Sequence, residues 1–309
     1  MESEFISWLR HRLPPHPQLR LGPGDDAAIV RLADRADCVV TTDLLAAGVH
    51  FELDRIDPRR AGRKALAVNL SDLAAMASRP LAAFVSLLLP QRGGRRLAME
   101  MYEGMLSLAE RHNVAIAGGD TNSWSGPLVI SVTAIGTVSD QGPLLRSGAR
   151  PGDQIVVTGR FGGSILGRQF DFDPRIDEAL QLHAGYELHA AIDVSDGVAI
   201  DLQHIARESR CGAVCETNRV PVAEAARQLA ASLDDGSTAL DHALGDGEDF
   251  ELILAVPPDS ARRLLSDQPL SVSLTRIGEF IEEPGLWETT ASGGRRPLAA
   301  KGYQHPLES

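Results

Sequence analysis

A nearly unbroken apolar run from Lys64 to Arg79 dominates the hydrophobic pattern of the chain. It reads KALAVNLSDLAAMASR, and its polar interior positions are Asn69, Ser71 and Asp72. A helix that is apolar on all sides is normally buried on most of them. An aspartate is seldom buried without a partner or a metal ion. Two interpretations of Asp72 are therefore open: a carboxylate that caps neighbouring backbone, or a metal ligand on a core helix.

The rest of the pattern alternates between predicted strands and helices. Helical periodicity predicts helices over 2–13, 57–78, 94–112, 175–188, 198–209, 222–233, 237–244 and 260–266, and a further helix follows the glycine turn at 159–164. Apolar and β-branched runs predict strands over 28–30, 38–42, 80–89, 114–117, 128–138, 153–158, 190–192, 212–216, 252–256 and 271–277, with another near 286. The Gly-, Pro- and Ser-rich segment 139–152 separates two sets of elements and is the best boundary between two α+β domains.

Acidic residues in the first half recur at predicted strand ends or on the buried helix. Asp25 and Asp26 follow a Gly-Pro-Gly turn, and Asp43 and Asp120 each follow a predicted strand. A solvated turn would explain the first pair alone, but not the recurrence that includes Asp72. Carboxylates without a His or Cys set favour Mg²⁺, Mn²⁺ or Ca²⁺ over Zn²⁺. Because no stretch matches the calcium loop of an EF-hand, the pattern favours magnesium with phosphate.

The second half repeats this placement. Asp193 and Asp196 follow the predicted strand over 190–192, and Ser195 lies between them. Capping of the next helix by Ser195 or Asp196 would explain one of these acids but not both. Arg146 lies in the boundary segment, where it is either an exposed linker arginine or a clamp for a phosphate or base. The glycine turn at 159–164 is a possible anion site, although it completes no Walker or GxGxxG motif.

Composition limits the classes of partner. The net charge of −12 argues against a nucleic acid or an anionic membrane as the main partner. The three cysteines have no metal-ligand spacing and are typical of reduced thiols. Residues 1–20 lack the apolar core of a signal peptide, and no run approaches the ~18 apolar residues of a membrane span. We therefore expect a soluble cytoplasmic protein.

Seven motifs taken together resemble one protein family. They are GPGDDAA (22–28), TTDLLAAGVHF (41–51), KALAVNLSDLAAMAS (64–78), AGGDT (117–121), RSGARPGD (146–153), IDVSDG (192–197) and GEDFEL (247–252), and a closing KGY (301–303) follows them. The set resembles the thiamine-monophosphate kinases, which belong to the superfamily of aminoimidazole ribonucleotide synthetase. The Asp motifs are shared loosely across the superfamily, whereas the NLSDLAAM helix, VHF and KGY are more specific to the kinases.

The resemblance implies a fold and a reaction. The fold is an α+β, two-domain, synthetase-like fold, with an ATP- and magnesium-binding N-terminal domain over 1–140 and a C-terminal domain over 150–309. The N-terminal sheet is expected to pair across a homodimer. The reaction passes the γ-phosphoryl group of ATP directly to thiamine monophosphate and gives thiamine diphosphate. The acceptor oxygen is already ionised at neutral pH, so positioning and charge neutralisation by several Mg²⁺ ions are expected to supply most of the rate, without a separate catalytic base.

The resemblance also assigns residues. The implied magnesium ligands are Asp26, Thr41, Thr42, Asp43, Asp72, Asp120, Asp193 and Asp196. The implied nucleotide contacts are Tyr102, Gly119, Asp120, Arg146 and Ser195. The implied contacts with thiamine monophosphate are His50, Glu248 and Tyr303. Tyr303 is suited to packing on an aromatic ring, and Glu248 to pairing with the cationic substrate.

The chain departs from the family pattern at three places. Gly163 in the turn GRFGGS stands where an acid is frequent, the segment 167–187 is short, and Phe250 replaces a usual tyrosine. None of these changes removes an implied metal ligand.

Two alternative functions remain open for this sequence. Selenophosphate synthetase needs a reactive residue near the N-terminus and the hydrogenase-maturation relative ends in cysteine, whereas the first cysteine here is Cys38 and the sequence ends in Pro306–Ser309. A descendant that binds nucleotide or metal without catalysis predicts lost ligands, and none is missing from the motifs.

Overall fold

The computed structural model describes residues 17–22, 24–32, 37–290 and 292–303. The elements of the N-terminal half are β1 (Leu19–Leu21), β2 (Ala28–Arg31), β3 (Asp37–Ala46), α2 (Pro58–Ala75), β4 (Arg79–Pro90), α3 (Gly94–Arg111), β5 (Ala115–Trp124) and β6 (Val129–Thr137). The predicted helix over 2–13 lies outside the described residues.

The N-terminal strands form one sheet in the order β1-β2-β3-β6-β4-β5. All its neighbours pair antiparallel except β4 and β5, which are parallel. Side chains alternate between faces along a strand, so Thr41 and Leu45 are buried toward α2 while Thr42 and Leu44 are exposed on the opposite face. We call that opposite face the open face; register places Phe84 and Ser86 of β4 on it as well.

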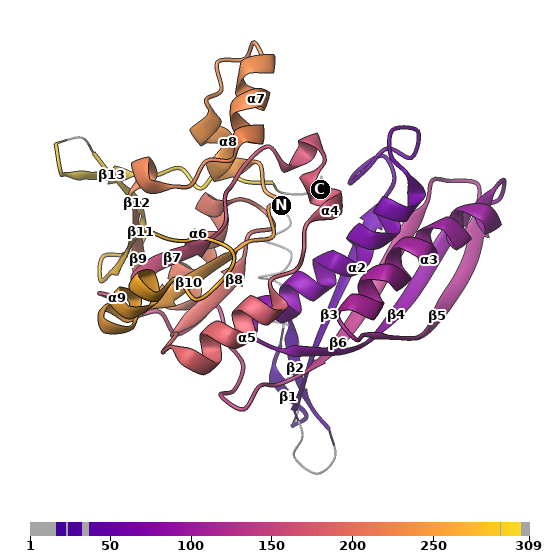
Figure 1. Ribbon diagram of the computed structural model, residues 1–309, viewed down its shortest axis with the longest axis horizontal. Helices are drawn as coiled ribbons and strands as arrows, with labels where there is room; N and C mark the ends of the chain where they lie inside the picture. Colours follow the sequence, from indigo (N-terminus) through magenta and orange to yellow (C-terminus); the bar gives the residue numbers. More distant parts are fainter. Residues whose placement is uncertain (1–16, 23, 33–36, 291, 304–309) are drawn as a thin grey trace.

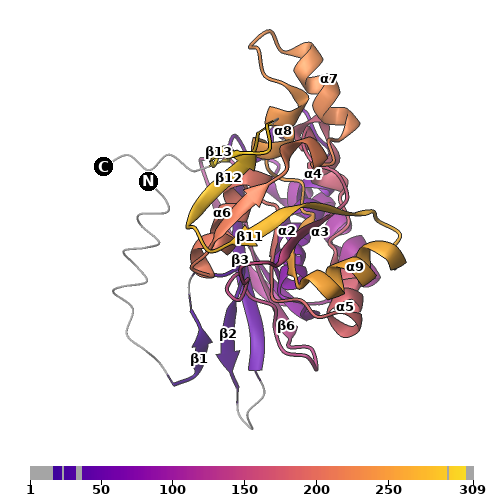
Figure 2. The same ribbon diagram turned by 90° about the vertical axis from the view of Figure 1, so that its left-hand side faces the viewer.

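The C-terminal half surrounds a second sheet. Its elements are β7 (Gln154–Thr158), the 3₁₀ helix η2 (Ser164–Leu166), α4 (Arg168–Asp171), α5 (Ile176–Gly185), β8 (Ala190–Asp193), α6 (Val198–Glu208), β9 (Gly212–Cys215), the 3₁₀ helix η3 (Thr217–Arg219), α7 (Glu224–Ser232), α8 (Ala239–Gly245), β10 (Leu252–Val256), α9 (Pro258–Asp267), β11 (Leu274–Ile281), β12 (Gly285–Thr289) and β13 (Arg295–Pro297). The strand order is β13-β12-β9-β11-β7-β10-β8. Helices α7 and α8 project at the top of the molecule, far from β1 and β2 (Figures 1 and 2).

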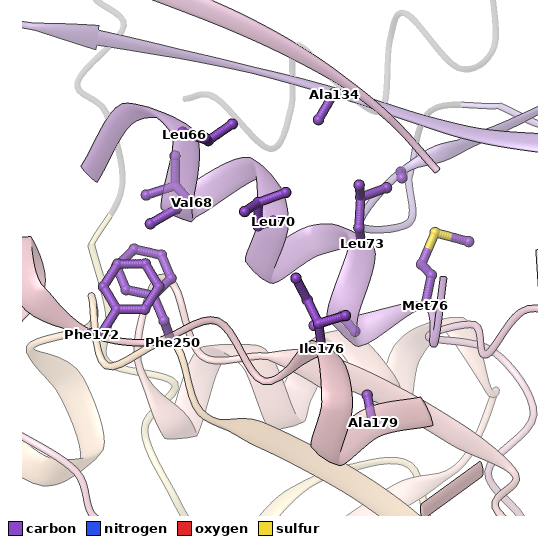
Figure 3. Close-up of a cluster of buried hydrophobic side chains, with 14 of the residues drawn as sticks. Leu66, Val68, Leu70, Leu73, Met76, Ala134, Phe172, Ile176, Ala179 and Phe250 are labelled. Atoms are coloured by element: carbon purple, nitrogen blue, oxygen red, sulfur yellow. The ribbon is translucent and has the colours of Figure 1, made fainter. Parts of the chain in front are cut away.

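Helix α2 lies between the two halves (Figure 1). Figure 3 shows Leu66 and Leu73 on the side of Ala134 from β6, while Ile176 and Ala179 from α5 lie on the other side. Phe172 and Phe250 stack on each other with ring centroids 4.1 Å apart, next to Val68 of α2 (Figure 3). A side chain at Gly62 would collide with α3, since a Cβ atom there would lie 2.1 Å from the Met101 carbonyl oxygen. The all-round burial predicted for this helix is therefore explained by its contacts on three sides.

The sequence identified most described elements and misjudged the length of several. β3 extends to Ala46 and β5 to Trp124, beyond their predicted ends at residues 42 and 117. The helix expected after the glycine turn is only the short η2 and α4. β1 and β13 were not predicted, because three-residue strands leave almost no periodic signal. The domain boundary within 139–152 stays a prediction. Among the described residues, no helix is long and apolar enough to cross a membrane.

Candidate functional site

Four carboxylates from distant segments meet beside α2. Asp26 precedes β2, Asp43 lies within β3, Asp72 projects from α2 and Asp193 ends β8. Carboxylate oxygens of Asp26, Asp72 and Asp193 all lie within 4.8 Å of one another, and the carboxyl group of Asp43 lies close enough to that of Asp72 to interact with it. We call this set the acidic cluster. It joins both halves of the chain, because the first three residues come from the N-terminal half and Asp193 from the C-terminal sheet.

Buried hydroxyl groups orient two of these carboxylates. The Thr41 hydroxyl donates to Asp72 Oδ2 at 2.5 Å, and the Ser71 hydroxyl donates to Asp193 Oδ2 at 2.5 Å. The sequence assigned no role to Ser71; its place beside Asp72 in an apolar helix was the only available signal.

Mutual repulsion and burial make the negative charge of the acidic cluster unfavourable. Burial raises the pKa of Asp43 to about 6. Burial, together with the neighbouring carboxylates, raises the pKa of Asp72 and that of Asp193 well above the usual range. Such shifts are expected where several acids share a site with too little positive charge.

Arg146 supplies positive charge to the acidic cluster. Its guanidinium group donates to Asp26 Oδ1 at 2.7 Å, so it is not an exposed linker side chain. Its backbone N–H donates to both carboxylate oxygens of Asp25, at 3.1 and 3.2 Å, which fixes the linker against the turn. Burial and the adjacent Asp26 raise the pKa of Asp25 to about 7. Asp25 therefore has a structural role, fixing the Arg146 linker, that the sequence did not suggest.

The acidic cluster fits a bound divalent cation. Asp26 Oδ2 is buried and has no hydrogen-bond partner among the described residues. A buried acceptor without a partner is costly, and a cation would satisfy it. The donors are carboxylates and hydroxyls, which are hard oxygen ligands suited to Mg²⁺ or Ca²⁺.

A second group of possible ligands follows β8. Asp196, Asp201 and His204 have ligand atoms within 4.8 Å of one another. The prediction that Ser195 or Asp196 caps α6 is wrong: the N-cap position is Gly197, and Asp201 Oδ2 accepts from the N–H groups of Asp196 and Gly197 at 3.1 and 2.9 Å. A carboxylate one turn into the helix thus reaches back to the N–H groups of the N-cap residue and of the residue before it.

Other residues predicted to bind metal or nucleotide lie far from the acidic cluster in the folded chain. Asp43 and Asp120 do not end their strands, contrary to the prediction, because β3 and β5 continue past them. Asp120 pairs with Ser86 and so lies on the open face with Thr42, whereas the acidic cluster lies on the α2 side. Strands β6 and β4 separate β3 from β5, a distance of about 14 Å at ordinary strand spacing.

Gly119 and Tyr102 belong to this outer part of the N-terminal half. A Cβ atom on Gly119 would lie 1.8 Å from the Val85 carbonyl oxygen, so the close approach that requires glycine here is between β5 and β4. The family resemblance had assigned Gly119 a contact with the nucleotide. Tyr102 lies on α3 and is half-buried against the core.

The three residues expected to contact thiamine monophosphate lie in two places. Glu248 and Tyr303 contact the segment after β8, whereas His50 lies in the turn after β3. The backbone N–H of Glu248 donates to the Ser195 carbonyl at 2.7 Å, and that of Tyr303 donates to the Asp196 carbonyl at 3.0 Å. His50 lies in the turn after β3, where its Nδ1 accepts from the Ala46 N–H at 3.1 Å. Lys64 connects His50 to Glu248, which the sequence did not predict.

A cavity of about 930 Å³ lies elsewhere, against β9, β11 and β12. Its lining includes Glu279, Glu283 and Arg295, and none of the predicted site residues.

Comparison with known proteins first defines the class. Residues 24–138 match the AIR synthase related protein, N-terminal domain, and residues 150–287 match the AIR synthase related protein, C-terminal domain. The two sheets with the acidic cluster between them thus belong to an AIR synthase related protein.

Individual relatives narrow this class. The thiamine-monophosphate kinase of Rhodopirellula baltica is 40% identical over 312 residues, which cover 99% of this chain and 97% of the relative. The crystal structure of thiamine-monophosphate kinase from Stenotrophomonas maltophilia is 34% identical with a TM-score of 0.73, covering 92% of this chain and 94% of that one. AaThiL complexed with AMPPCP and TMP is 25% identical with a TM-score of 0.81, covering 98% and 95%. The chain belongs to the thiamine-monophosphate kinase family.

Proposed function

We propose that the protein transfers the γ-phosphoryl group of ATP to the phosphate of thiamine monophosphate, giving thiamine diphosphate and ADP. Whole-chain identity of 40% to a thiamine-monophosphate kinase supports this activity, as does the likeness to a relative complexed with an ATP analogue and TMP. The observation that carries the proposal is the convergence of Asp26, Asp43, Asp72 and Asp193 from four separate segments.

The acidic cluster is the proposed magnesium site. Asp26, Asp43, Asp72 and Asp193 would hold the ions with the Thr41 hydroxyl, and Asp196 would contribute from the adjacent group. When bound, magnesium neutralises and bridges phosphate oxygens, which two reacting phosphates require. The surplus of negative charge over the one guanidinium of Arg146 supports this assignment.

The remaining side chains have binding and positioning roles in this proposal. Arg146 binds the nucleotide phosphates and partly offsets their charge, with Ser195 nearby. Glu248 and His50 bind the organic part of thiamine monophosphate, and Tyr303, whose side chain is 46% exposed, covers it. Because the acceptor phosphate is already ionised, these residues act by holding the two phosphates in reach of each other.

We also propose a homodimer formed over the open face. Leu44 and Phe84 are 59% and 41% exposed there, and exposed apolar surface of this kind is typical of interfaces. Thr42 and Asp120 lie on the same face, so their proposed magnesium roles, and the nucleotide role of Asp120, are expected to need the dimer. Tyr102 and Gly119 keep their proposed nucleotide roles at the outer edge of the N-terminal half. A cytoplasmic location fits the three free, buried cysteines and the use of ATP.

Product analysis tests the activity. Purified protein with ATP, Mg²⁺ and thiamine monophosphate is expected to form thiamine diphosphate and ADP in equal amounts, and EDTA should stop the reaction. ATP binding without product would contradict the proposal and favour a descendant that binds nucleotide only. Turnover of an aminoimidazole-type amidine instead would indicate another reaction of the superfamily.

A further inference from the structure

Lys64 is a charged side chain inside the protein core. It begins the apolar run on α2, and its side chain is 0% exposed. Lysine is almost never fully buried unless it is paired, and burial lowers the pKa of this ammonium group. A residue kept at this cost, with no place in the magnesium site, calls for an explanation.

Three acceptors from three segments surround the Lys64 ammonium group. Nζ donates to Glu248 Oε1 at 2.6 Å, to Gln169 Oε1 of α4, and to the His50 carbonyl oxygen at 3.5 Å. An ammonium group has three protons to donate, so these contacts use all of them. Lys64 therefore has no donor left for a substrate phosphate, and any effect on the substrate must pass through its partners.

Glu248 is the partner through which such an effect would pass. Its backbone adopts φ 54°, an uncommon conformation for a residue other than glycine, and its N–H is bonded to Ser195. The contact with Lys64 uses one carboxylate oxygen, and the side chain remains 32% exposed. Lys64 thus fixes one oxygen of the Glu248 carboxylate, while the rest of the side chain remains accessible from solvent.

We propose that Lys64 is a positioning residue for thiamine monophosphate: it fixes the Glu248 carboxylate and the His50 turn across the two halves, so that Glu248 faces the cationic part of the substrate. This inference rests on the proposed function. It predicts a role in binding the organic part of the substrate and none in binding ATP. Loss of a residue that orients a binding group typically costs 10–100-fold, by analogy with outer-shell partners at metal sites.

Arg60 provides a matched control. It lies four residues earlier on α2 and also reaches the C-terminal half, where it binds Asp171 and the Gly167 carbonyl. Its guanidinium carbon lies 5.2 Å from the Phe170 ring centroid, and Lys64 Nζ lies 5.1 Å from the same centroid. Arg60 has no described contact with Glu248. A merely structural role in joining the halves would therefore be shared by both residues.

The experiment compares the wild type with Lys64→Met, Lys64→Gln, Arg60→Met, Glu248→Gln and the double variant Lys64→Met/Glu248→Gln. For each, kcat and the KM for thiamine monophosphate and for ATP are measured at saturating magnesium, alongside thermal unfolding. Lys64→Met should raise the KM for thiamine monophosphate about 10–100-fold and change the KM for ATP less than about twofold. Lys64→Gln, which keeps a donor for Glu248, should recover part of the loss and replaces Lys64→Met if that variant does not fold.

Two results would support the coupling, and four would overturn it. The double variant should be no worse than Glu248→Gln alone, because both changes remove the same interaction, and Arg60→Met should keep a near-normal KM. Independent, multiplicative effects of Lys64→Met and Glu248→Gln, or equal effects of Lys64→Met and Arg60→Met, would overturn the inference. An active wild type with an unchanged KM in both Lys64 variants would also overturn it, while leaving the proposed function intact. A wild type that forms no thiamine diphosphate would instead overturn the proposed function and this inference with it.

Discussion

Two groups of buried acids in this protein differ in where their positive charge comes from. The acidic cluster places Asp26, Asp43, Asp72 and Asp193 around one arginine, Arg146. The second group, which we call the ionic network, comprises Asp249, Glu251, Arg168, Arg175, Ser164 and Thr158.

The ionic network supplies its own counter-charge. Glu251 accepts two hydrogen bonds from Arg175 at 2.7 Å each, one from Thr158 at 2.7 Å and one from Arg168. Asp249 accepts from the Gly162 N–H at 2.8 Å and from the Ser164 hydroxyl at 2.6 Å. Both carboxylates are fully bonded, and the network holds the glycine turn and α4 against β10.

The acidic cluster leaves its charge only partly compensated by the protein, because one arginine, Arg146, lies beside four carboxyl groups. Asp26 Oδ2 has no partner among the described residues, whereas both carboxylates of the ionic network are hydrogen-bonded. A raised pKa does not separate the two groups, because burial raises the pKa of Asp249 to about 7 just as it raises the pKa of Asp43, Asp72 and Asp193. Under the proposed function, buried acid therefore serves two purposes here: it stabilises the fold where the chain provides the cations, and it binds cations from solution where the chain does not. This difference leads to opposite expectations for mutations in the two groups.

Asp72→Asn should have the largest effect, a loss of about a thousandfold or more in turnover, because a metal ligand contributes several kcal/mol to the transition state. The unfolding temperature should not fall, since the change removes one of several repelling carboxylates. Turnover at saturating magnesium and thermal unfolding of the same sample measure both. Wild-type turnover in this variant would remove Asp72 from the site.

Glu251→Gln should show the opposite result. It removes the negative partner of two arginines in the ionic network and should destabilise the fold by about 3–5 kcal/mol. The kcat of the folded protein should stay near normal. Denaturant unfolding and turnover at 25 °C distinguish the two quantities, and a loss of activity without a loss of stability would refute the comparison.

Magnesium should stabilise the protein in a pH-dependent way. The folded-state pKa of Asp43 is about 6, above the usual 3.8, so the metal-free protein loses stability as pH rises through that interval. Bound magnesium offsets this loss, by about 2.7 kcal/mol at a hundredfold excess over its Kd. The increase in Tm on adding magnesium should therefore be larger near pH 7.5 than near pH 5. Asp72→Asn should reduce that increase, whereas Glu251→Gln should retain it.

Tyr303→Ala should have the smallest effect. The side chain is half-exposed and belongs to neither acidic group, and the backbone contact of residue 303 with Asp196 survives the substitution. The KM for thiamine monophosphate should rise about tenfold through lost ring packing, and the KM for ATP should not change. Equal changes in the two values would remove Tyr303 from the substrate site.

The amino-acid sequence alone was sufficient for most of the fold, and all four members of the acidic cluster were among the residues that it singled out. Helix α2 was predictable because its apolar run is long, and Asp72 stood out because an apolar helix gives a carboxylate no obvious partner. The family motifs likewise identified Asp26, Asp43 and Asp193, which the structure brings to Asp72.

Contacts between distant segments could not be predicted in this way. The pattern could not separate Asp43 from Asp120, because which face of a sheet a residue occupies depends on strand register and order. It gave no sign that Asp25 fixes the Arg146 linker or that Lys64 joins His50 to Glu248. Local composition sets which segments become strands and helices, whereas the pairing of groups that lie as many as 184 residues apart in the chain depends on how the two halves pack around α2.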